Sequence, residues 1–175
     1  MTGQLRTDHI VDLLADHVLS RGLERASLRP LAAAAGTSDR MLLYYFPDKA
    51  ALITAILTRI AQRLQVQLDA FDVGAARRDA AQLQAGILEV ARTQMFRPYM
   101  HVWLELAAKA ARGEEPFRAI GAAIAAGFLT WISDRLEVEP PETRAAQALS
   151  VLTMIEGAVV LDALGLGLPA IGDRA

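Results

Sequence analysis

Side chains able to carry out chemistry are few in this sequence. His101 and Glu105 are four residues apart in a segment with helical periodicity, so they would lie one turn apart on one face, as two metal ligands can. No third ligand accompanies them, and we predict neither a metal site nor a cofactor. The motifs of serine hydrolases, zinc metalloproteases, phosphate-binding loops and dinucleotide-binding domains do not occur. We predict that the protein is not an enzyme, since a small helical enzyme would depend on His101 and Glu105 alone.

A larger group of side chains has the composition of a small-molecule pocket. Such pockets are walled by aromatic and methionine side chains with a few polar groups among them. Glu156 is the most distinctive member, because a carboxylate in an otherwise apolar helix needs a partner. That partner would be a ligand cation, an arginine of a second subunit or a backbone amide. The candidate pocket residues are Gln94, Phe96, Tyr99, His101, Trp103, Glu105, Phe128, Trp131, Met154 and Glu156.

Residues 27–49, SLRPLAAAAGTSDRMLLYYFPDK, predict two short helices joined by a tight turn. Ser27 and Ser38 carry hydroxyls able to cap helix N-termini, and Gly36 accepts the left-handed conformation that ends a helix. Pro47 stops the second helix. Two short helices around a glycine-containing turn form the helix-turn-helix pattern, whose second helix enters the major groove of DNA.

The rest of the chain also predicts helices, separated by prolines and glycines. No alternating pattern or hairpin signal predicts a strand. We therefore expect an all-α fold of eight or nine helices. The expected helices cover residues 5–22, 28–35, 39–46, 49–71, 78–96, 98–112, 116–137 and 142–164.

The composition indicates a soluble, intracellular protein. The 175 residues are 53% hydrophobic and 22% charged, which suits a buried core and excludes a disordered chain. The absence of cysteine excludes a disulfide framework and fits the cytoplasm. The N-terminus lacks the apolar stretch of a signal peptide. The longest run without a charged side chain, residues 119–133, has 15 residues and is too short to span a bilayer, so we predict no membrane partner.

The net charge of −2 is unevenly distributed along the chain. Residues 1–64 contain 8 basic and 6 acidic side chains, whereas residues 65–175 contain 10 and 14. A mildly basic N-terminal part is compatible with DNA binding, although the imbalance is small.

Residues 119–133 are apolar or small on every helical face, and in residues 145–161 only Glu156 is charged. A helix that is apolar all round must be buried on more than one side. We expect one side to face the core and the other a second subunit, which gives a homodimer. The alternative is an internal helix pair in a monomer.

The first 64 residues resemble the DNA-binding domain of TetR-type transcriptional regulators. The matching elements are the helix from Ile10 to Gly22, Ala26-Ser27, Leu31-Ala32-Ala35-Gly36, Ser38, and Tyr45-Phe46-Pro47-Asp48-Lys49 leading into Leu52. The resemblance implies a helix-turn-helix DNA-binding domain of three helices over residues 4–64. It also implies a C-terminal helical ligand-binding and dimerisation domain over residues 65–175. From their apolar character, we expect the dimer contacts to be made by the helices over residues 116–137 and 142–164.

The same resemblance implies which residues meet DNA. Tyr45 and Lys49 stand where the family contacts backbone phosphates. Ser27 and Ser38 do so near helix N-termini, where free amides attract phosphate. Arg40, early in the second helix, is the best candidate for bidentate contact with guanine. The full set of expected DNA contacts is Ser27, Arg29, Thr37, Ser38, Arg40, Met41, Tyr44, Tyr45 and Lys49.

Some positions depart from the family pattern. Arg40 replaces a small glycine, Leu43 an aromatic residue, Asp39 a common lysine, and His17 a core aliphatic residue. We expect Leu42, Leu43 and Phe46 to be core residues. Tyr44 is either an exposed reader of DNA or packed on the first helix. For His17 we expect a hydrogen-bonded core histidine rather than a pH switch.

From these features we predict a ligand-responsive transcriptional regulator. It would be a repressor that binds a palindromic operator as a homodimer and is released by a small molecule. Only a ligand that prefers the non-operator state can release DNA. The alternative is a helical dimer that binds a hydrophobic small molecule or a protein, with an idle DNA head.

Overall fold

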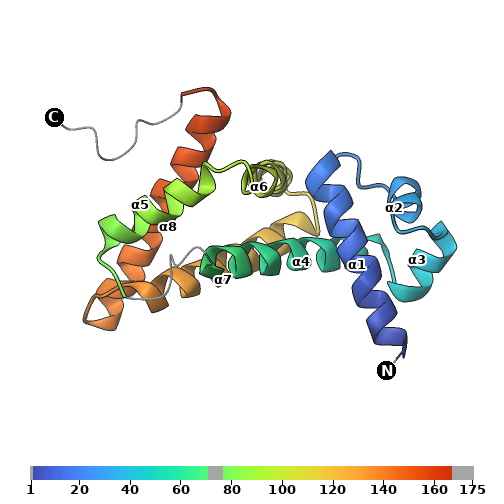
Figure 1. Ribbon diagram of the computed structural model, residues 1–175, viewed down its shortest axis with the longest axis horizontal. Helices are drawn as coiled ribbons and strands as arrows, with labels where there is room; N and C mark the ends of the chain where they lie inside the picture. The colour runs from blue at the N-terminus through green and yellow to red at the C-terminus, as the bar shows by residue number, and fades with distance from the viewer. Residues whose placement is uncertain (1, 71–76, 167–175) are drawn as a thin grey trace. The chain divides into compact units, whose positions relative to one another are not determined.

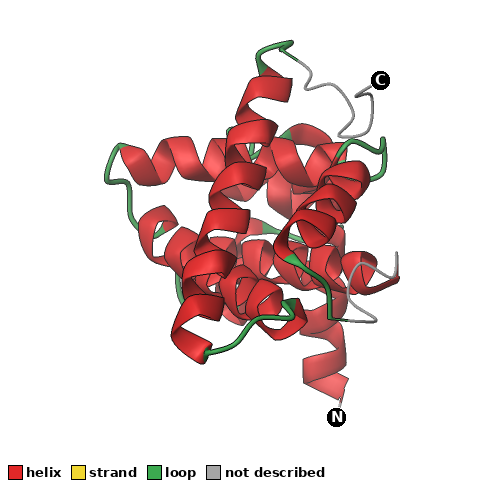
Figure 2. Cartoon of the chain, turned by 90° about the vertical axis from the view of Figure 1, so that its left-hand side faces the viewer, coloured by secondary structure: helices red, strands yellow, loops and turns green. Residues whose placement is uncertain are grey.

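The computed structural model describes residues 2–70 and 77–166, and the described residues form helices and loops (Figures 1 and 2). The helices are α1 (Thr2–Arg21), α2 (Leu28–Ala34), α3 (Asp39–Tyr45), α4 (Lys49–Ala70), α5 (Ala80–Ala91), α6 (Arg97–Ala111), α7 (Phe117–Arg135) and α8 (Pro141–Ala163). Within these ranges, an isolated parallel bridge between Arg78 and Leu136 is the one β-type pairing. The predicted all-α class is confirmed.

The expected helix boundaries agree with the structure to within a few residues, except around α5. We predicted a helix over 78–96, and α5 covers Ala80–Ala91. It starts late because Asp79 caps it, accepting a bond from the Gln82 amide at 2.8 Å. It ends early because the Thr93 hydroxyl donates to the Val90 carbonyl at 2.8 Å, and the backbone turns there.

The chain divides into two compact units. Unit 1 comprises Met1–Leu64 and His101–Ile124, and unit 2 comprises Gln65–Met100 and Ala125–Ala175. The first division in the chain falls at the expected domain boundary, after residue 64. Unit 1 also contains most of α6 and the start of α7, which the expected domains place in the C-terminal part. The roles of the two expected domains remain a prediction.

The core of unit 1 is built from aliphatic side chains on one face of each helix. In Figure 1, α2 and α3 lie next to α1, and α2 packs on both of its neighbours. The large side chains that are fully buried are Leu14, Val18, Leu31, Leu42, Leu52, Ile56 and Leu106. Burial of this kind contributes about 1.5–3 kcal/mol for each side chain.

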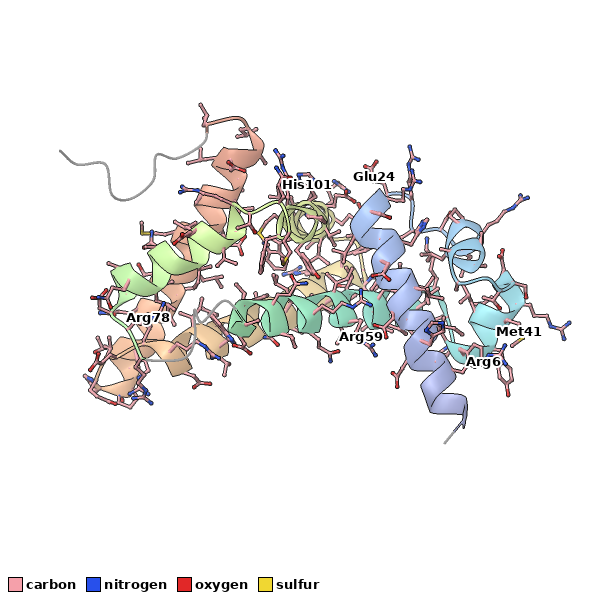
Figure 3. All side chains as sticks on the ribbon, viewed as in Figure 1. Arg6, Glu24, Met41, Arg59, Arg78 and His101 are labelled. Carbon is pink, nitrogen blue, oxygen red and sulfur yellow. The ribbon has the colours of Figure 1, made fainter. Side chains whose placement is uncertain are left out.

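An ionic ladder joins α1 to α4 inside unit 1. The ladder consists of Asp8, Asp12 and Asp16 on α1 with Arg59 and Arg63 on α4. Arg59 binds Asp12 at 2.7 Å and Asp8 at 3.1 Å, and Figure 3 shows Arg59 reaching from α4 toward α1. Arg63 binds Asp12 and Asp16, both at 2.6 Å. Residues four apart lie on one helix face, so two matching rows of charge can face each other.

The ladder shifts the ionisation of its central members. Partial burial raises the pKa of Asp12, but the hydrogen bonds and charges of Arg63 and Arg59 outweigh it and hold that pKa below its ordinary value of 3.8. Burial likewise lowers the pKa of Arg63, and Asp16 and Asp12 outweigh this and raise it. A carboxyl with a lowered pKa in the folded state stabilises the fold above its unfolded pKa. That contribution disappears as the pH falls through the lower, folded value.

We therefore expect Arg63→Met to destabilise the protein by about 1 kcal/mol near neutral pH, since it removes two half-exposed ion pairs while keeping the apolar stem. The difference from the native chain should shrink below about pH 3.8. Urea unfolding followed by circular dichroism at pH 7 and pH 3 measures it. Arg25→Met, at an exposed position of the α1–α2 loop, is the control. If Arg63→Met lowers the free energy of unfolding equally at both pH values, the ion pairs of the ladder do not stabilise the fold as proposed.

Unit 2 has an apolar core between α5 and α8 and a polar cluster beside it. Asp69 accepts bonds from the Trp131 indole at 3.0 Å and from Arg135 at 2.7 Å. The Arg135 guanidinium also lies over the Trp131 ring, 4.1 Å from its centroid. The side-chain amide of Gln67 donates to the Tyr99 hydroxyl at 3.1 Å, which leaves its buried carbonyl without a hydrogen-bond partner among the described residues.

Helix α8 has two apolar faces. One face is buried and carries Ala148, Val151, Ile155, Ala158 and Val159. The opposite face is exposed over nearly five turns, and the partly buried Glu156 lies at its edge. We call this face the α8 stripe; its members are Ala146, Leu149, Ser150, Thr153, Gly157, Val160 and Leu164, with exposed Met154 at its edge.

By length and composition alone, α8 could cross a membrane, since an 18-residue window has a mean hydropathy of 1.4. Only 22% of that window is buried, so the stripe accounts for much of the apolar exposure. One such helix is weak evidence for a membrane protein, because interface and core helices of soluble proteins have the same composition.

Candidate nucleic-acid interface

The turn between α2 and α3 is fixed by backbone hydrogen bonds. Gly36 has a φ of 61°, a left-handed conformation in which glycine carries no Cβ penalty. Its N–H donates to the Ala33 carbonyl at 3.1 Å, and the Thr37 N–H donates to the Ala32 carbonyl at 2.9 Å. This pair of bonds is the Schellman motif that closes a helix. The predicted turn at Gly36 is confirmed.

The two serines that we expected to cap helices behave differently. Ser38 caps α3, because its hydroxyl accepts from the Met41 amide at 3.3 Å. Ser27 has the extended N-cap backbone of α2, but its side chain makes no capping bond. The capping role expected for the Ser27 hydroxyl is therefore wrong. Among the described residues its exposed hydroxyl makes no capping bond, so its donor and acceptor are available to another partner.

Helix α3 separates a buried face from an exposed one. Leu42 and Phe46, four residues apart, are 0% and 7% exposed and hold the helix against unit 1. Arg40, Leu43 and Tyr44 point outward. Tyr44 is 78% exposed and stacks edge-on against Tyr45, so the alternative of packing on the first helix is excluded.

Leu43 corrects an expectation, because we predicted a core residue and its side chain is 44% exposed. With Leu42 and Phe46 facing inward, helical geometry turns residue 43 about 100° away from the core. Leu43 therefore belongs to the same exposed surface as Arg40 and Tyr44. The signal available in the sequence was the spacing of Leu42 and Phe46.

The other expected DNA contacts lie around α3. Ser27, Arg29, Ser38 and Lys49 are exposed, and Thr37, Met41 and Tyr45 are partly exposed. Figure 3 shows Met41 on α3. The structure brings Thr37 to Tyr45 together on one turn and helix, with Ser27 and Arg29 at the start of α2 and Lys49 at the start of α4.

The ionic ladder pairs acidic and basic side chains of residues 1–64 unequally, so that, among the described residues, more basic than acidic side chains remain unpaired. Half of the six acidic side chains of residues 1–64 are bound by Arg59 and Arg63. The remaining basic side chains are exposed and, within the described ranges, form no ion pair with an acidic residue. They are Arg6, Arg21, Arg25, Arg29, Arg40 and Lys49. These cations outnumber Glu24, Asp39 and Asp48, which leaves a surplus of positive charge.

The candidate pocket residues divide between the two units. Phe96, Tyr99 and Trp131 are buried in unit 2, and Phe128 and Glu156 are partly buried there. Gln94 and Met154 of unit 2 are exposed. His101, Trp103 and Glu105 belong to unit 1, where His101 is exposed. The Glu105 carboxylate accepts bonds from the backbone amides of Leu23 and Glu24. No group of three potential metal ligands occurs in the ranges described.

His17 lies partly buried on α1, and its ring nitrogen Nε2 is buried with no hydrogen-bond partner among the described residues. The expectation of a hydrogen-bonded core histidine is therefore wrong at this nitrogen.

Residues 14–56 match the family model described as bacterial regulatory proteins of the tetR family. No curated protein matches the chain. Among solved structures, the chain is similar to a putative TetR-family transcriptional regulator from Rhodococcus sp., with 22% identity, a TM-score of 0.71, and coverage of 92% of this chain and 88% of that one.

Two further structures have the same fold. A transcriptional regulator from Rhodococcus sp. Rha1 is 24% identical, with a TM-score of 0.68 and coverage of 91% of this chain and 83% of that one. The transcriptional regulator FadR from Bacillus subtilis, solved in complex with stearoyl-CoA, is 14% identical, with a TM-score of 0.60 and coverage of 90% and 87%.

The fold and the exposed second helix therefore define a helical protein with an N-terminal helix-turn-helix domain. The chain carries the N-terminal domain of the tetR family, and its fold is that of TetR-family transcriptional regulators. The resemblance seen in the sequence is confirmed.

Proposed function

We propose that the protein is a cytoplasmic transcriptional repressor that binds a palindromic DNA operator as a homodimer and is released by a small molecule. The observation that carries this proposal is the surface of α3, where Arg40, Leu43 and Tyr44 are exposed together on a helix fixed by a buried opposite face. A helix presented in this way can enter the major groove.

The chemistry of this surface suits base reading and phosphate binding. The Arg40 guanidinium can donate two parallel bonds to guanine, and Leu43 and Met41 can contact a thymine methyl. Ser27, Arg29, Tyr45 and Lys49 frame α3 with hydroxyls and cations, which are the groups that bind backbone phosphates. The exposed cations outside the ionic ladder add sequence-independent attraction to DNA.

The α8 stripe supports dimerisation. Alanine, serine, threonine and glycine run along its centre, and Leu149, Val160 and Leu164 flank them. Small residues let two helices approach closely, and the absence of charge among the stripe's members suits burial against an identical helix. On α7, the exposed small residues Ala119, Ala122, Ala126 and Thr130 have the same character.

The effector would be largely apolar, with a group that donates a hydrogen bond. Unit 2 supports this, because Phe96, Tyr99 and Trp131 supply buried aromatic surface. The buried carbonyl of Gln67 lacks a partner among the described residues and so offers an acceptor beside the Tyr99 hydroxyl. The stearoyl-CoA complex of the Bacillus relative shows that this fold accommodates a large acyl ligand in that protein.

The test is selection of DNA by the purified chain from random duplexes, followed by binding measurements at several salt concentrations. We expect a palindrome with half-site centres one helical turn apart, about 34–36 Å, or a multiple of it. Binding should weaken steeply with added salt. If the chain selects no sequence, and small molecules still raise its melting temperature, the alternative of a ligand-binding dimer with an idle DNA head replaces this proposal.

A further inference from the structure

A carboxylate of α6 holds the loop that connects α1 to α2. Oε2 of Glu105 accepts a hydrogen bond from the Leu23 amide at 2.5 Å and a second from the Glu24 amide at 3.2 Å. The partners are separated by 82 and 81 residues in the chain, and all of them belong to unit 1. We call this contact the Glu105 tie.

The loop is shaped to receive such a group. Gly22 follows α1 in a left-handed conformation with a φ of 82°, which turns the next two amides away from the helix. Consecutive amides around a left-handed residue form a concave donor site for an anionic oxygen. A Cβ at Gly22 would lie 2.5 Å from Oε1 of Glu105, so the carboxylate occupies the space that glycine leaves.

The α6 end of the tie is itself fixed. Leu106, the next residue, is 1% exposed, and a Cβ at Gly121 of α7 would lie 3.2 Å from its side chain. Glu105 therefore projects from a packed helix rather than from a mobile loop. At the other end, Leu23 and Ala26 are 4% and 5% exposed, so the loop is anchored on both sides of the tied amides.

We propose that Glu105 is a positioning residue for DNA reading, which sets the direction in which the chain leaves α1 and enters α2. This inference builds on the proposed function. Helix α2 packs on α1 and on α3, so the direction of the loop determines how α3 is presented. Glu105 touches no DNA in this role; it acts through the amides of residues 23 and 24.

The length of the side chain is the property to test. Glu105→Gln keeps an acceptor at the same reach, whereas Glu105→Asp keeps the charge and shortens the reach by one methylene. We expect Asp and Ala variants to lose operator affinity about tenfold, because a hydrogen bond to a charged group contributes on the order of that factor, and the Gln variant to lose much less. Glu24→Gln removes the same charge from an exposed side chain in the same loop and is the matched control.

Two readouts separate positioning from simple loss of stability. The first is the ratio of operator to random-DNA affinity at a temperature where circular dichroism shows every variant folded. A smaller folded fraction lowers both affinities alike, whereas a misdirected α3 lowers only the operator affinity. The second is hydrogen exchange of the residue 23 and 24 amides without DNA, which we expect to accelerate in the Asp and Ala variants. Unchanged exchange, or an unchanged ratio, would overturn the inference.

The outcomes also distinguish this inference from the proposed function. If the native chain selects no operator, the proposed function fails, and the positioning role in DNA reading fails with it. Hydrogen exchange of the residue 23 and 24 amides then still decides whether the Glu105 tie exists. If the native chain binds its operator and the Ala variant keeps the native ratio, only the inference fails.

A double-mutant cycle gives an independent check of the tie. Gly22→Ala introduces a side chain into the left-handed position and against Glu105. The backbone strain is the same with or without Glu105, so it cancels in the cycle and the contact energy remains. We expect Gly22→Ala to cost more in the native background than in the Glu105→Ala background. Equal costs would show that the carboxylate does not occupy this space in solution.

Discussion

Replacing Leu149 with glutamate should convert the proposed homodimer to a monomer and abolish its proposed cooperative binding to a palindromic operator. Leu149 is 56% exposed on the α8 stripe, and a twofold interface would bury two copies of the new carboxylate without partners. A total cost of about 4 kcal/mol corresponds to a thousandfold rise in the dimer dissociation constant. Analytical ultracentrifugation across protein concentrations measures that constant directly.

A matched control separates the interface from the general effect of an added charge. Val66 is 68% exposed on α4, outside the stripe, so Val66→Glu adds the same group to an exposed apolar position. We expect Val66→Glu to remain dimeric and to bind the operator like the native chain. A Leu149→Glu protein that stays dimeric would show that the α8 stripe is not the interface.

Arg40→Ala should relax the choice of base, whereas Lys49→Ala should weaken binding to all sequences alike. A bidentate arginine–guanine contact discriminates by about 1–3 kcal/mol, so the Arg40 variant should lose roughly tenfold to a hundredfold of its preference at one position of each half-site. Lys49 lies at the start of α4 and presents an exposed cation, which suits a phosphate contact.

The measurement is a panel of duplexes in which each base pair of the half-site is changed in turn, with each variant titrated at several salt concentrations. Loss of the Lys49 phosphate contact should reduce the salt slope by about one. Arg29→Ala, at an exposed position of α2, tests whether phosphate contacts extend to that helix. An Arg40 variant that weakens all duplexes equally would assign Arg40 to phosphate.

The helices could be predicted from the sequence because their start and stop signals are local. Gly36 and Pro47 follow the two short helices, whose predicted ends at residues 35 and 46 are each one residue beyond the observed ends. Leu43 shows the limit of composition as a guide. Its apolar side chain suggests a core residue, but its position next to the inward-facing Leu42 turns it outward.

Contacts between distant segments could not be predicted in the same way. The one-turn spacing of the three aspartates on α1 is visible in the sequence, but their arginine partners depend on how α1 crosses α4. Glu105 is the clearest case, because we predicted that it lines a ligand pocket. Its observed partners are backbone amides, which carry no signature in a sequence.

The ionic ladder also constrains how this chain can be recombined with its relatives. A hybrid protein joined between Asp16 and Arg59 would take the three carboxylates from one parent and the positions of the two guanidiniums from the other. If the second parent lacks the matching row, three acidic side chains or two partly buried arginines are left without compensation. A crossover after Arg63 transfers both rows together. Hybrid proteins that test the proposed operator preference should therefore be joined after Arg63, with α1 and residues 49–63 of α4 taken from the same parent.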